Sequence, residues 1–184
     1  MGLAEKIHSL PKEEIRRLAL KGEIILASAE GIKILHQQII KAQEEMVTTQ
    51  AAIGQVAKDD GDLPENLQFK ELRVKAMFQL PRAIQSLRIM EAKTVEFQEN
   101  NGETVIFGSQ VDLAINYPDG ETEEGRFSLL GPIEASYMTI NKTGVKVISY
   151  QSPVGQSIWG AKPGSTVEYK IPDGEVRCVI KSVE

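Results

Sequence analysis

Hydrophobic residues in the first half of the chain recur at alternating spacings of three and four positions, which is the period of a narrow helical seam. The seam comprises Ile32, Leu35, Ile39, Ala42, Met46, Thr49, Ile53 and Val56. Ser28 precedes it as a candidate N-cap, and Glu30 follows in the expected first turn. A stripe this narrow predicts one helix of a two-helix coiled coil, running for about 28 residues or roughly 40 Å.

A second helical seam follows, and its register shifts by one residue halfway along. It comprises Phe69, Leu72 and Ala76, and then Met77, Leu80, Ile84 and Leu87. Pro81 lies just after the shift. Because a proline inside a helix removes one hydrogen bond and clashes with the carbonyl four residues earlier, we predict a kink near residues 79–81. The two seams together predict an antiparallel helical hairpin over residues 28–98.

Between the two seams lies the acidic turn Lys58-Asp-Asp-Gly-Asp-Leu-Pro-Glu-Asn66, which holds four carboxylates within seven residues. Gly61 can adopt the positive φ that ends a helix, and Asp62 can cap the next helix, with Glu65 in its first turn. Asp62 and Glu65 could therefore serve only as helix caps. They could also present carboxylate oxygens to a hard metal ion. Spacing alone leaves both interpretations open.

After Glu103 the periodicity changes from helical to strand-like. Strand patterns cover residues 104–116, 126–130, 145–150, 166–171 and 176–181, and residues 152–160 form a candidate short helix. The chain is thus expected to have three parts: an N-terminal extension with a short helix (1–27), the hairpin (28–98) and a small antiparallel sheet packed on one helix (104–184). The predicted class is α+β.

The formal net charge of −5 over 184 residues argues against a protein that coats nucleic acid, because such proteins gain affinity from many Lys and Arg residues. The 41% hydrophobic content is typical of a globular protein. The single cysteine, Cys178, favours a reducing compartment. With neither a signal-peptide pattern nor a run of about eighteen apolar residues, we expect a cytoplasmic protein without membrane association. We also expect a monomer.

Several motifs, taken in their order and spacing, resemble one protein family. Residues 28–35, SAEGIKIL, resemble the family's opening TPEGYEKL, and residues 61–66, GDLPEN, followed by Phe69, resemble its motif GDLxENAxY. Residues 105–108, VIFG, the stretch SPVGQSIWGAKPG at 152–164 and the Pro-Asp-Gly turn at 172–174 resemble its C-terminal domain. The chain is therefore similar to bacterial transcript cleavage factors of the GreA/GreB family.

The resemblance implies an FKBP-like fold for the C-terminal domain and bacterial RNA polymerase as the partner. The hairpin would enter the polymerase secondary channel, while Gln151, Ser152 and Pro153 would bind a coiled coil of the largest subunit at the channel rim. Asp62 and Glu65 match the two acidic positions that help hold the second Mg²⁺ and orient the attacking water. The Mg²⁺ would be shared with the polymerase active site, and the factor would have no cofactor of its own and would not be an enzyme by itself.

Further residues beside the acidic turn match positions that the family uses near the polymerase active site and the 3′ end of backtracked RNA. They are Asn66, Phe69, Lys70 and Arg73. Most charge runs on a helix form an ordinary solvated face, and that interpretation holds for Lys70 and Arg73 as well. Close to RNA, the same two side chains become candidate phosphate contacts.

Three functions stay open from the sequence. The first is a factor that stimulates transcript cleavage, which the intact Asp62 and Glu65 pair favours. The second is a non-cleaving regulator of the secondary channel, like DksA or the inhibitory relatives, which the additional Asp59 and Asp60 favour. The third is a prolyl isomerase, suggested only by the fold of the second domain; the sparse aromatic residues argue against it, and Trp159 is expected in the core.

Overall fold

The computed structural model describes residues 7, 9–59, 66–98, 102–141 and 143–184 and divides the chain into two compact units. Residues 1–34 and 94–184 form the sheet unit, and residues 35–93 form the hairpin unit. Residues 1–27, expected as a separate extension, belong to the same unit as the C-terminal sheet. The α+β class that the sequence predicts is confirmed.

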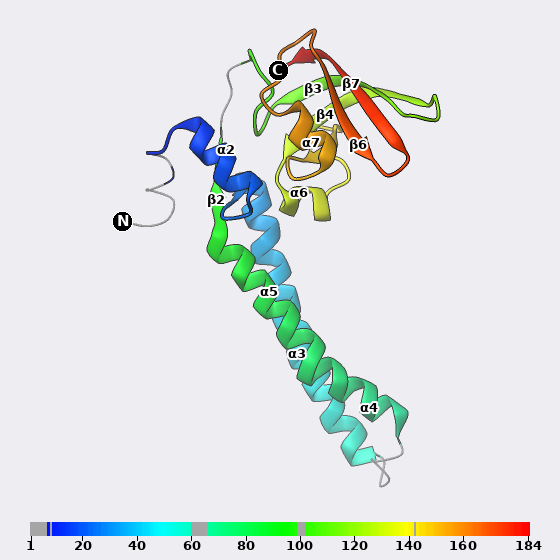
Figure 1. Cartoon of the computed structure of the whole chain (residues 1–184). Coiled ribbons are helices and arrows are strands. Elements are labelled where there is room, and N and C mark those ends of the chain that lie inside the picture. Colours follow the sequence, from blue (N-terminus) through cyan, green and yellow to red (C-terminus); the bar gives the residue numbers. More distant parts are fainter. Residues whose placement is uncertain (1–6, 8, 60–65, 99–101, 142) are drawn as a thin grey trace. The chain divides into compact units, whose positions relative to one another are not determined.

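The helix α3 is continuous over 31 residues, Ala29–Asp59 (Figure 1). At 1.5 Å per residue it is about 46 Å long. Its predicted seam is correct, because Leu35 and Ile39 are buried, as is Thr49, the one polar member. The Ser28 Oγ accepts a hydrogen bond from the Gly31 N–H at 3.1 Å, which confirms the expected N-cap. Within the described part of the chain, no helix is long and apolar enough to cross a membrane.

The second arm of the hairpin contains an irregular turn at the place where the sequence predicts a kink. The arm consists of α4 (Leu67–Val74), the π-helical segment η1 (Lys75–Gln79) and α5 (Leu80–Lys93). In η1 the Leu80 N–H donates to the carbonyl of Lys75, five residues earlier, so the turn holds one residue more than an α-helical turn. Pro81, whose nitrogen carries no proton, follows directly.

This π-helical turn compensates for the one-residue shift of the second seam, so that the residues before and after the shift both face inward. Ala76 and Leu80, which lie on either side of the shift, are both buried. Met77 was expected to open the second half of the seam, and that assignment is wrong, because its side chain is 56% exposed. The wider turn rotates the helix so that Leu80 follows Ala76 on the inner face, which leaves Met77 outside.

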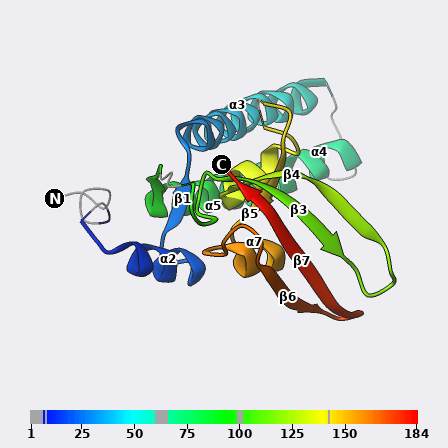
Figure 2. The same cartoon turned by 90° about the horizontal axis from the view of Figure 1, so that it is seen from above.

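The sheet unit is built on a five-stranded sheet in the order β5-β4-β3-β7-β6 (Figure 2). The strands are β3 (Gln110–Asn116), β4 (Thr122–Leu130), β5 (Lys146–Ser149), β6 (Thr166–Ile171) and β7 (Gly174–Val183). Neighbours are antiparallel except β4 and β5, which pair in parallel. Parallel pairing needs a crossover, and here it contains α6 (Pro132–Tyr137), a helix that the strand patterns did not predict.

The core of the sheet unit follows the two-residue alternation of its strands. Val111, Leu113 and Ile115 of β3 are buried, and Cys178 of β7 is buried opposite Ile115. Burial raises the pKa of the Cys178 thiol to about 11, so it is an inert core side chain. The strand-like pattern from residue 104 is partly wrong, because β3 begins only at Gln110. The helix α7 (Pro153–Ile158), as expected, lies against the sheet.

Two short strands of the sheet unit flank the hairpin in the sequence. They are β1 (Ile25–Ala27) and β2 (Thr94–Glu96), which pair in parallel, and at three residues each they leave no readable pattern in the sequence. The Leu26 N–H donates a hydrogen bond to the buried Tyr150 hydroxyl at 3.1 Å. The predicted N-terminal helix is present as α2 (Lys12–Leu20), and its Ile15 and Ala19 belong to the same core.

A polar cluster on the outer face of β3, β4 and β7 stabilises the sheet at its surface. The Arg126 guanidinium donates to both oxygens of Asp112 at 2.9 Å, and the Ser182 hydroxyl donates to Asp112 Oδ2 at 2.6 Å. Arg126 also contacts the Glu184 carboxylate at 3.1 Å. The hydrogen bonds from Arg126, followed by that from Ser182, lower the pKa of the Asp112 carboxyl to about 2.

We predict that Asp112 makes the stability of the sheet unit depend on acid. The pKa of its carboxyl lies below the ordinary 3.8. Its contribution to the free energy of unfolding is therefore full above about pH 4 and is lost as the pH falls toward 2. Asp112→Asn should lower the free energy of unfolding by about 1 kcal/mol at pH 7, a modest value because the pair is partly exposed and screened. The free energy of unfolding of this variant should also change less with pH between about pH 4 and 2 than that of the wild-type protein. Glu168→Gln, which breaks the single Arg177 contact, is the control.

A second prediction concerns the start of α4. The Asn66 Oδ1 accepts a hydrogen bond from the Phe69 N–H at 2.9 Å and so caps the helix. Asn66→Ala should destabilise α4 by about 1 kcal/mol, whereas Asn66→Asp should keep the cap. Amide hydrogen exchange at Phe69 measures the difference. Equal exchange in the two variants would show that the cap contributes nothing.

Candidate functional site

The two acidic residues expected to act on a metal, Asp62 and Glu65, lie outside the described residues. The structure describes what flanks them: α3 ends at Asp59, and α4 begins at Leu67 in the same unit. Among the described residues no group of three or more His, Cys, Asp or Glu side chains could hold a metal ion. The helix that follows is capped by Asn66, so the expectation that Asp62 caps it and that Glu65 lies in its first turn is wrong.

Asn66, Phe69 and Arg73, which the sequence places beside the acidic turn, come together on one side of α4. The Asn66 side chain is engaged by the backbone of Phe69, as described above. The Arg73 guanidinium lies over the Phe69 ring at 5.6 Å from its centroid, a cation–π arrangement. Arg73 Nη2 also lies 4.0 Å from the Met77 sulfur. The guanidinium is thus held along the helix while its residue stays exposed.

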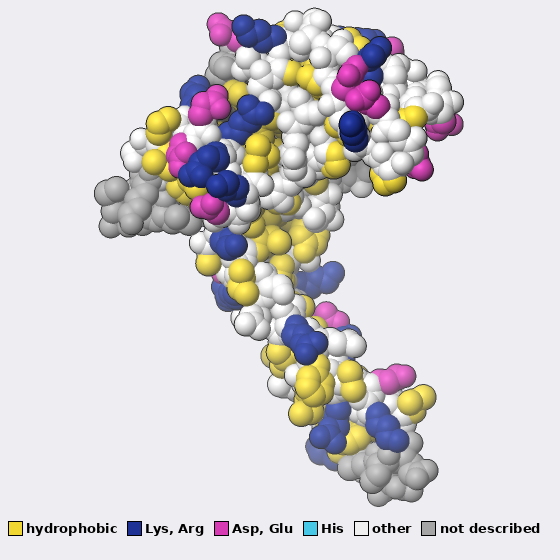
Figure 3. All heavy atoms as spheres, in the orientation of Figure 1, with side chains coloured by type: hydrophobic (Ala, Val, Ile, Leu, Met, Phe, Trp, Pro, Cys, Tyr) yellow, Lys and Arg dark blue, Asp and Glu magenta, His cyan; other side chains and the backbone are white. Residues whose placement is uncertain are grey.

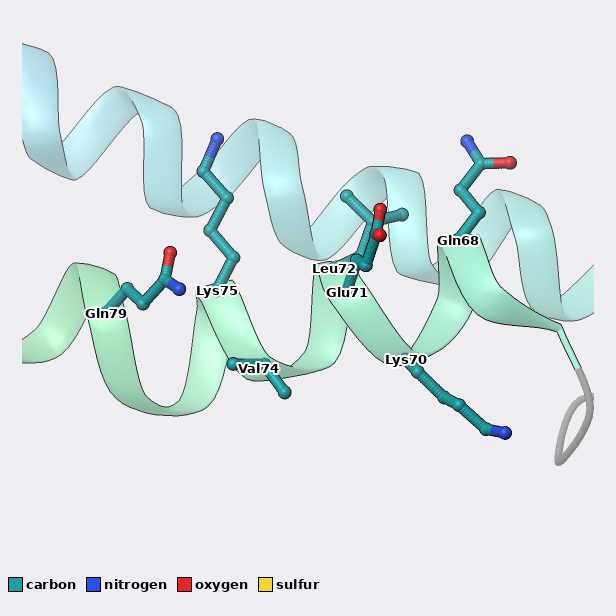
Figure 4. Close-up of a pocket in the computed structure, with 7 residues that line it drawn as sticks. All are labelled: Gln68, Lys70, Glu71, Leu72, Val74, Lys75 and Gln79. Atoms are coloured by element: carbon teal, nitrogen blue, oxygen red, sulfur yellow. The ribbon is translucent and has the colours of Figure 1, made fainter.

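Lys70 and Lys75 differ in their surroundings, although both belong to the same basic run. The Lys75 ammonium forms an ion pair with Glu45 of α3 at 2.7 Å, and this hydrogen bond lowers the pKa of the Glu45 carboxyl. Lys70 is exposed and points away from α3 (Figure 4). Lys75 is therefore used within the hairpin, whereas Lys70 is available to a partner.

A groove of about 510 Å³ runs beside this part of the hairpin. In Figure 4, Lys75 and Glu71 project toward α3, and Val74 lies on the same outer side as Lys70. The residues that line the groove are Gln68, Lys70, Glu71, Leu72, Val74, Lys75 and Gln79. It is an open surface groove beside the helix with mixed polar and apolar walls, which suits contact with a macromolecule better than enclosure of a small ligand.

Exposed apolar side chains accompany the basic ones, and the sequence analysis did not identify them. They are Leu67, Val74, Met77 and Phe78. The hydrophobic and basic side chains can be followed along the hairpin in Figure 3. A signal existed in the sequence, because positions 67, 74 and 78 share a helical face that the buried seam does not use. This face can contact apolar and anionic groups of a partner together.

The residues expected at the polymerase rim form the start of α7. The Ser152 Oγ accepts from the Gly155 N–H at 3.1 Å and donates to the Ser149 carbonyl at 2.7 Å. A Cβ on Gly155 would lie only 2.0 Å from that carbonyl oxygen, so the close turn requires glycine. The Ser152 hydroxyl is thus committed to the fold on both sides, and its role is that of a helix cap.

Pro153 and Gln151, on either side of this cap, present the accessible groups. Pro153 is exposed and occupies the first position of α7. The Gln151 carbonyl accepts from the Gln156 side chain at 2.9 Å, while the Gln151 residue is half-buried. The surface offered to a partner at this site therefore consists of the Pro153 ring and amide side chains, with little charge.

Trp159 is in the core, as expected. Its ring packs edge-on against Tyr150 at 5.1 Å between centroids, and the Arg16 guanidinium lies over it at 5.8 Å. With both contacts in place, the ring is not available as the floor of a proline-binding pocket. This arrangement disfavours the prolyl isomerase interpretation.

Comparison with known proteins identifies relatives over most of the chain. Residues 99–184 match the family model described as Transcription elongation factor, GreA/GreB, C-term. The chain is 31% identical to transcription elongation factor GreA of Desulfovibrio desulfuricans over 151 residues, which cover 81% of this chain and 86% of that protein. It is also 31% identical to GreA of Clostridium beijerinckii over 151 residues, 79% of this chain and 86% of that protein.

Solved structures of similar proteins include the GreA factor homolog 1 protein of Thermus thermophilus, with 21% identity, a TM-score of 0.37, and coverage of 88% of this chain and 99% of that one. GreA/GreB from Nitrosomonas europaea has 19% identity, a TM-score of 0.31, and coverage of 86% and 98%. Superpositions this loose add nothing to the assignment, which rests on sequence identity. Because four fifths of the chain aligns with a GreA protein at 31% identity, the chain belongs to the GreA/GreB family of transcription elongation factors.

Proposed function

We propose that this chain stimulates RNA polymerase to cleave backtracked RNA. The acidic turn of the hairpin would enter the secondary channel, and the polymerase would carry out the Mg²⁺-dependent hydrolysis. The observation that carries the proposal is the continuous helix α3, which leads over 31 residues to a turn holding both Asp62 and Glu65. A long helix ending in carboxylates suits delivery of oxygen ligands to a buried site in another protein.

The chemistry of the two side chains fits Mg²⁺, which prefers carboxylate oxygens and retains several waters. When bound, the ion supplies a polarised phosphate and an activated water. Two carboxylates are too few to hold the ion by themselves, so the polymerase active site would provide the remaining ligands. In this proposal Asp62 and Glu65 bind the ion and orient the water, and the chain acts as an accessory to the catalyst.

Side chains of α4 would contact the surroundings of the active site or the RNA end. Lys70 is exposed and directed away from α3, which fits a phosphate contact. Arg73 is held over Phe69 at 5.6 Å, so its guanidinium is already oriented before a partner arrives. Asn66 would act mainly by capping α4, since its side-chain oxygen accepts from the Phe69 N–H.

The sheet unit would bind the polymerase rim through the start of α7. Pro153 is exposed there, and the hydroxyl of Ser152 holds the turn in shape. The partner surface would be a helical coiled coil of the largest subunit. An exposed proline ring beside amide groups fits such a surface, because it offers apolar contact without a desolvation cost for charge.

A second candidate function is inhibition of the polymerase without cleavage. The observation that favours it is the presence of Asp59 and Asp60 beside the acidic pair, which gives four carboxylates within seven residues. Such a concentration of negative charge could bind the polymerase metal in an unproductive arrangement. The two functions make opposite predictions for the length of RNA in a backtracked complex.

We predict that the wild-type protein shortens the RNA of a backtracked complex from its 3′ end, and that Asp62→Asn and Glu65→Gln prevent this. Asn and Gln keep the size and hydrogen-bonding ability of the acidic side chains but lose the negative charge that a metal ion needs. Each variant should lower the cleavage rate by at least about 100-fold. Replacing a residue that only orients a metal ligand costs up to about 100-fold, and loss of a direct ligand should cost at least as much. Gel analysis of the labelled RNA measures the rate.

Asp59→Asn serves as the matched control, because it removes one carboxylate from the same turn and should leave most of the cleavage rate. If Asp62→Asn cleaved at the wild-type rate, the assignment of Asp62 as a metal ligand would be wrong. Wild-type protein that bound the polymerase and blocked cleavage would instead support the inhibitory function.

A further inference from the structure

The first turn of α3 is held by a buried carboxylate from a distant part of the sheet unit. Glu134, in α6, is fully buried. Its Oε1 accepts two hydrogen bonds from Ser28, one from the backbone N–H and one from the hydroxyl, both at 2.7 Å. The same hydroxyl accepts from the Gly31 N–H at 3.1 Å. Glu134 therefore supports the residue that caps α3.

Two glycines provide the space that this carboxylate occupies. A Cβ on Gly31 would lie 2.3 Å from Glu134 Oε1, closer than any tolerable contact. A Cβ on Gly131 would lie 2.2 Å from the Leu26 carbonyl oxygen and 2.8 Å from Glu134 Oε2. Glycine is thus required at both positions by close approach. Gly31, Gly131 and Glu134 fit together as one packed junction.

The same short segment is held a second time, two residues earlier. The buried Tyr150 hydroxyl accepts from the Leu26 N–H at 3.1 Å, and β1 pairs with β2 on its other side. Burial raises the pKa of the Tyr150 hydroxyl to about 12, so it stays protonated. Residues 26–31 are therefore held within the sheet unit by hydrogen bonds at Leu26 and Ser28, at the point where α3 begins.

Stability alone does not account for Glu134. Burying a carboxylate is costly, and Oε2 has no hydrogen-bond partner in the described part of the molecule. Ser28 could cap α3 without it, as serine does at many helices. The positive end of the helix dipole favours the negative charge, but by only about 1 kcal/mol. Because burial of the Glu134 carboxylate is costly, its presence beside the first turn of α3 suggests that it fixes the position of that turn.

We propose that Glu134 is a positioning residue that fixes the base of the hairpin so that the acidic turn is delivered accurately. The inference rests on the proposed cleavage function. Because α3 is one helix of about 46 Å, a change of about 10° at its first turn would displace its far end by about 8 Å. Catalytic geometry tolerates far less, since a misplacement of about 1 Å can cost about 100-fold in rate.

The first test separates the rate of cleavage from binding. Glu134→Ala should lower the maximal cleavage rate at saturating factor by at least about 10-fold. It should change the half-saturating concentration less than about twofold, because the proposed rim contacts at α7 are untouched. Glu134→Gln keeps an acceptor for Ser28 and should restore part of the rate. Glu168→Gln, which replaces an exposed glutamate of the same unit, is the matched control.

The second test uses the contact between Gly31 and Glu134. Gly31→Ala adds a methyl group where the carboxylate lies, so it should reduce the maximal rate in the wild-type background. In the Glu134→Ala background the space is vacant, and the same methyl should have little effect. Alanine favours the helix over glycine by about 1 kcal/mol, so a loss in Gly31→Ala cannot come from helix propensity. The effects of Gly31→Ala and Glu134→Ala on the maximal cleavage rate should therefore be strongly non-additive.

Hydrogen exchange of the free protein gives a readout without polymerase. Glu134→Ala should accelerate exchange of the Ser28 and Gly31 amides while circular dichroism shows an intact fold. A wild-type maximal rate in Glu134→Ala, additive effects of the two substitutions, or an equal loss of binding would each overturn this inference. Wild-type protein that fails to stimulate cleavage would overturn the proposed function itself, and with it the positioning role, whatever the exchange rates.

Discussion

The structure depends on the continuity of α3, which begins in the sheet unit and reaches the acidic turn without interruption. Its first turn is held by Ser28 and Glu134, and its seam is buried at Leu35 and Ile39. Helix formation is cooperative, and in proteins most helical stability comes from a packed apolar face. The second arm of the hairpin supplies that face. Without this packing, α3 would not be expected to stay continuous over its 31 residues.

The second arm shows how a helix can follow a partner when its own apolar pattern changes register. Ala76 and Leu80 are both buried although Pro81 prevents an ordinary hydrogen bond at the next position. The π-helical turn satisfies the Leu80 N–H through Lys75 and rotates the later residues into contact. The same turn leaves Met77 outside, close to the Arg73 guanidinium. One local irregularity thus determines both the packing of the hairpin and the character of its outer surface.

Local patterns in the sequence predicted the features that depend on neighbouring residues. The seam of α3 and the Ser28 cap arise from interactions within a few positions, and both are confirmed. Near the predicted kink the structure has a π-helical turn, Lys75–Gln79, which precedes Pro81. The parallel pairing of β4 with β5 and the contact from Glu134 to Ser28, 106 positions apart, have no local signature. The metal ligands stay a prediction, because Asp62 and Glu65 lie outside the described residues.

Three helix starts bear on how the family motifs should be interpreted. Ser28, Asn66 and Ser152 each place a side-chain oxygen on a backbone N–H of the following turn. An oxygen used in this way is less available to a partner, so a motif can keep such a residue for the shape it gives to the backbone. Recognition then belongs to the exposed neighbours that the cap orients. By this argument Lys70 and Pro153 are better candidates for direct contact with the polymerase than Asn66 and Ser152.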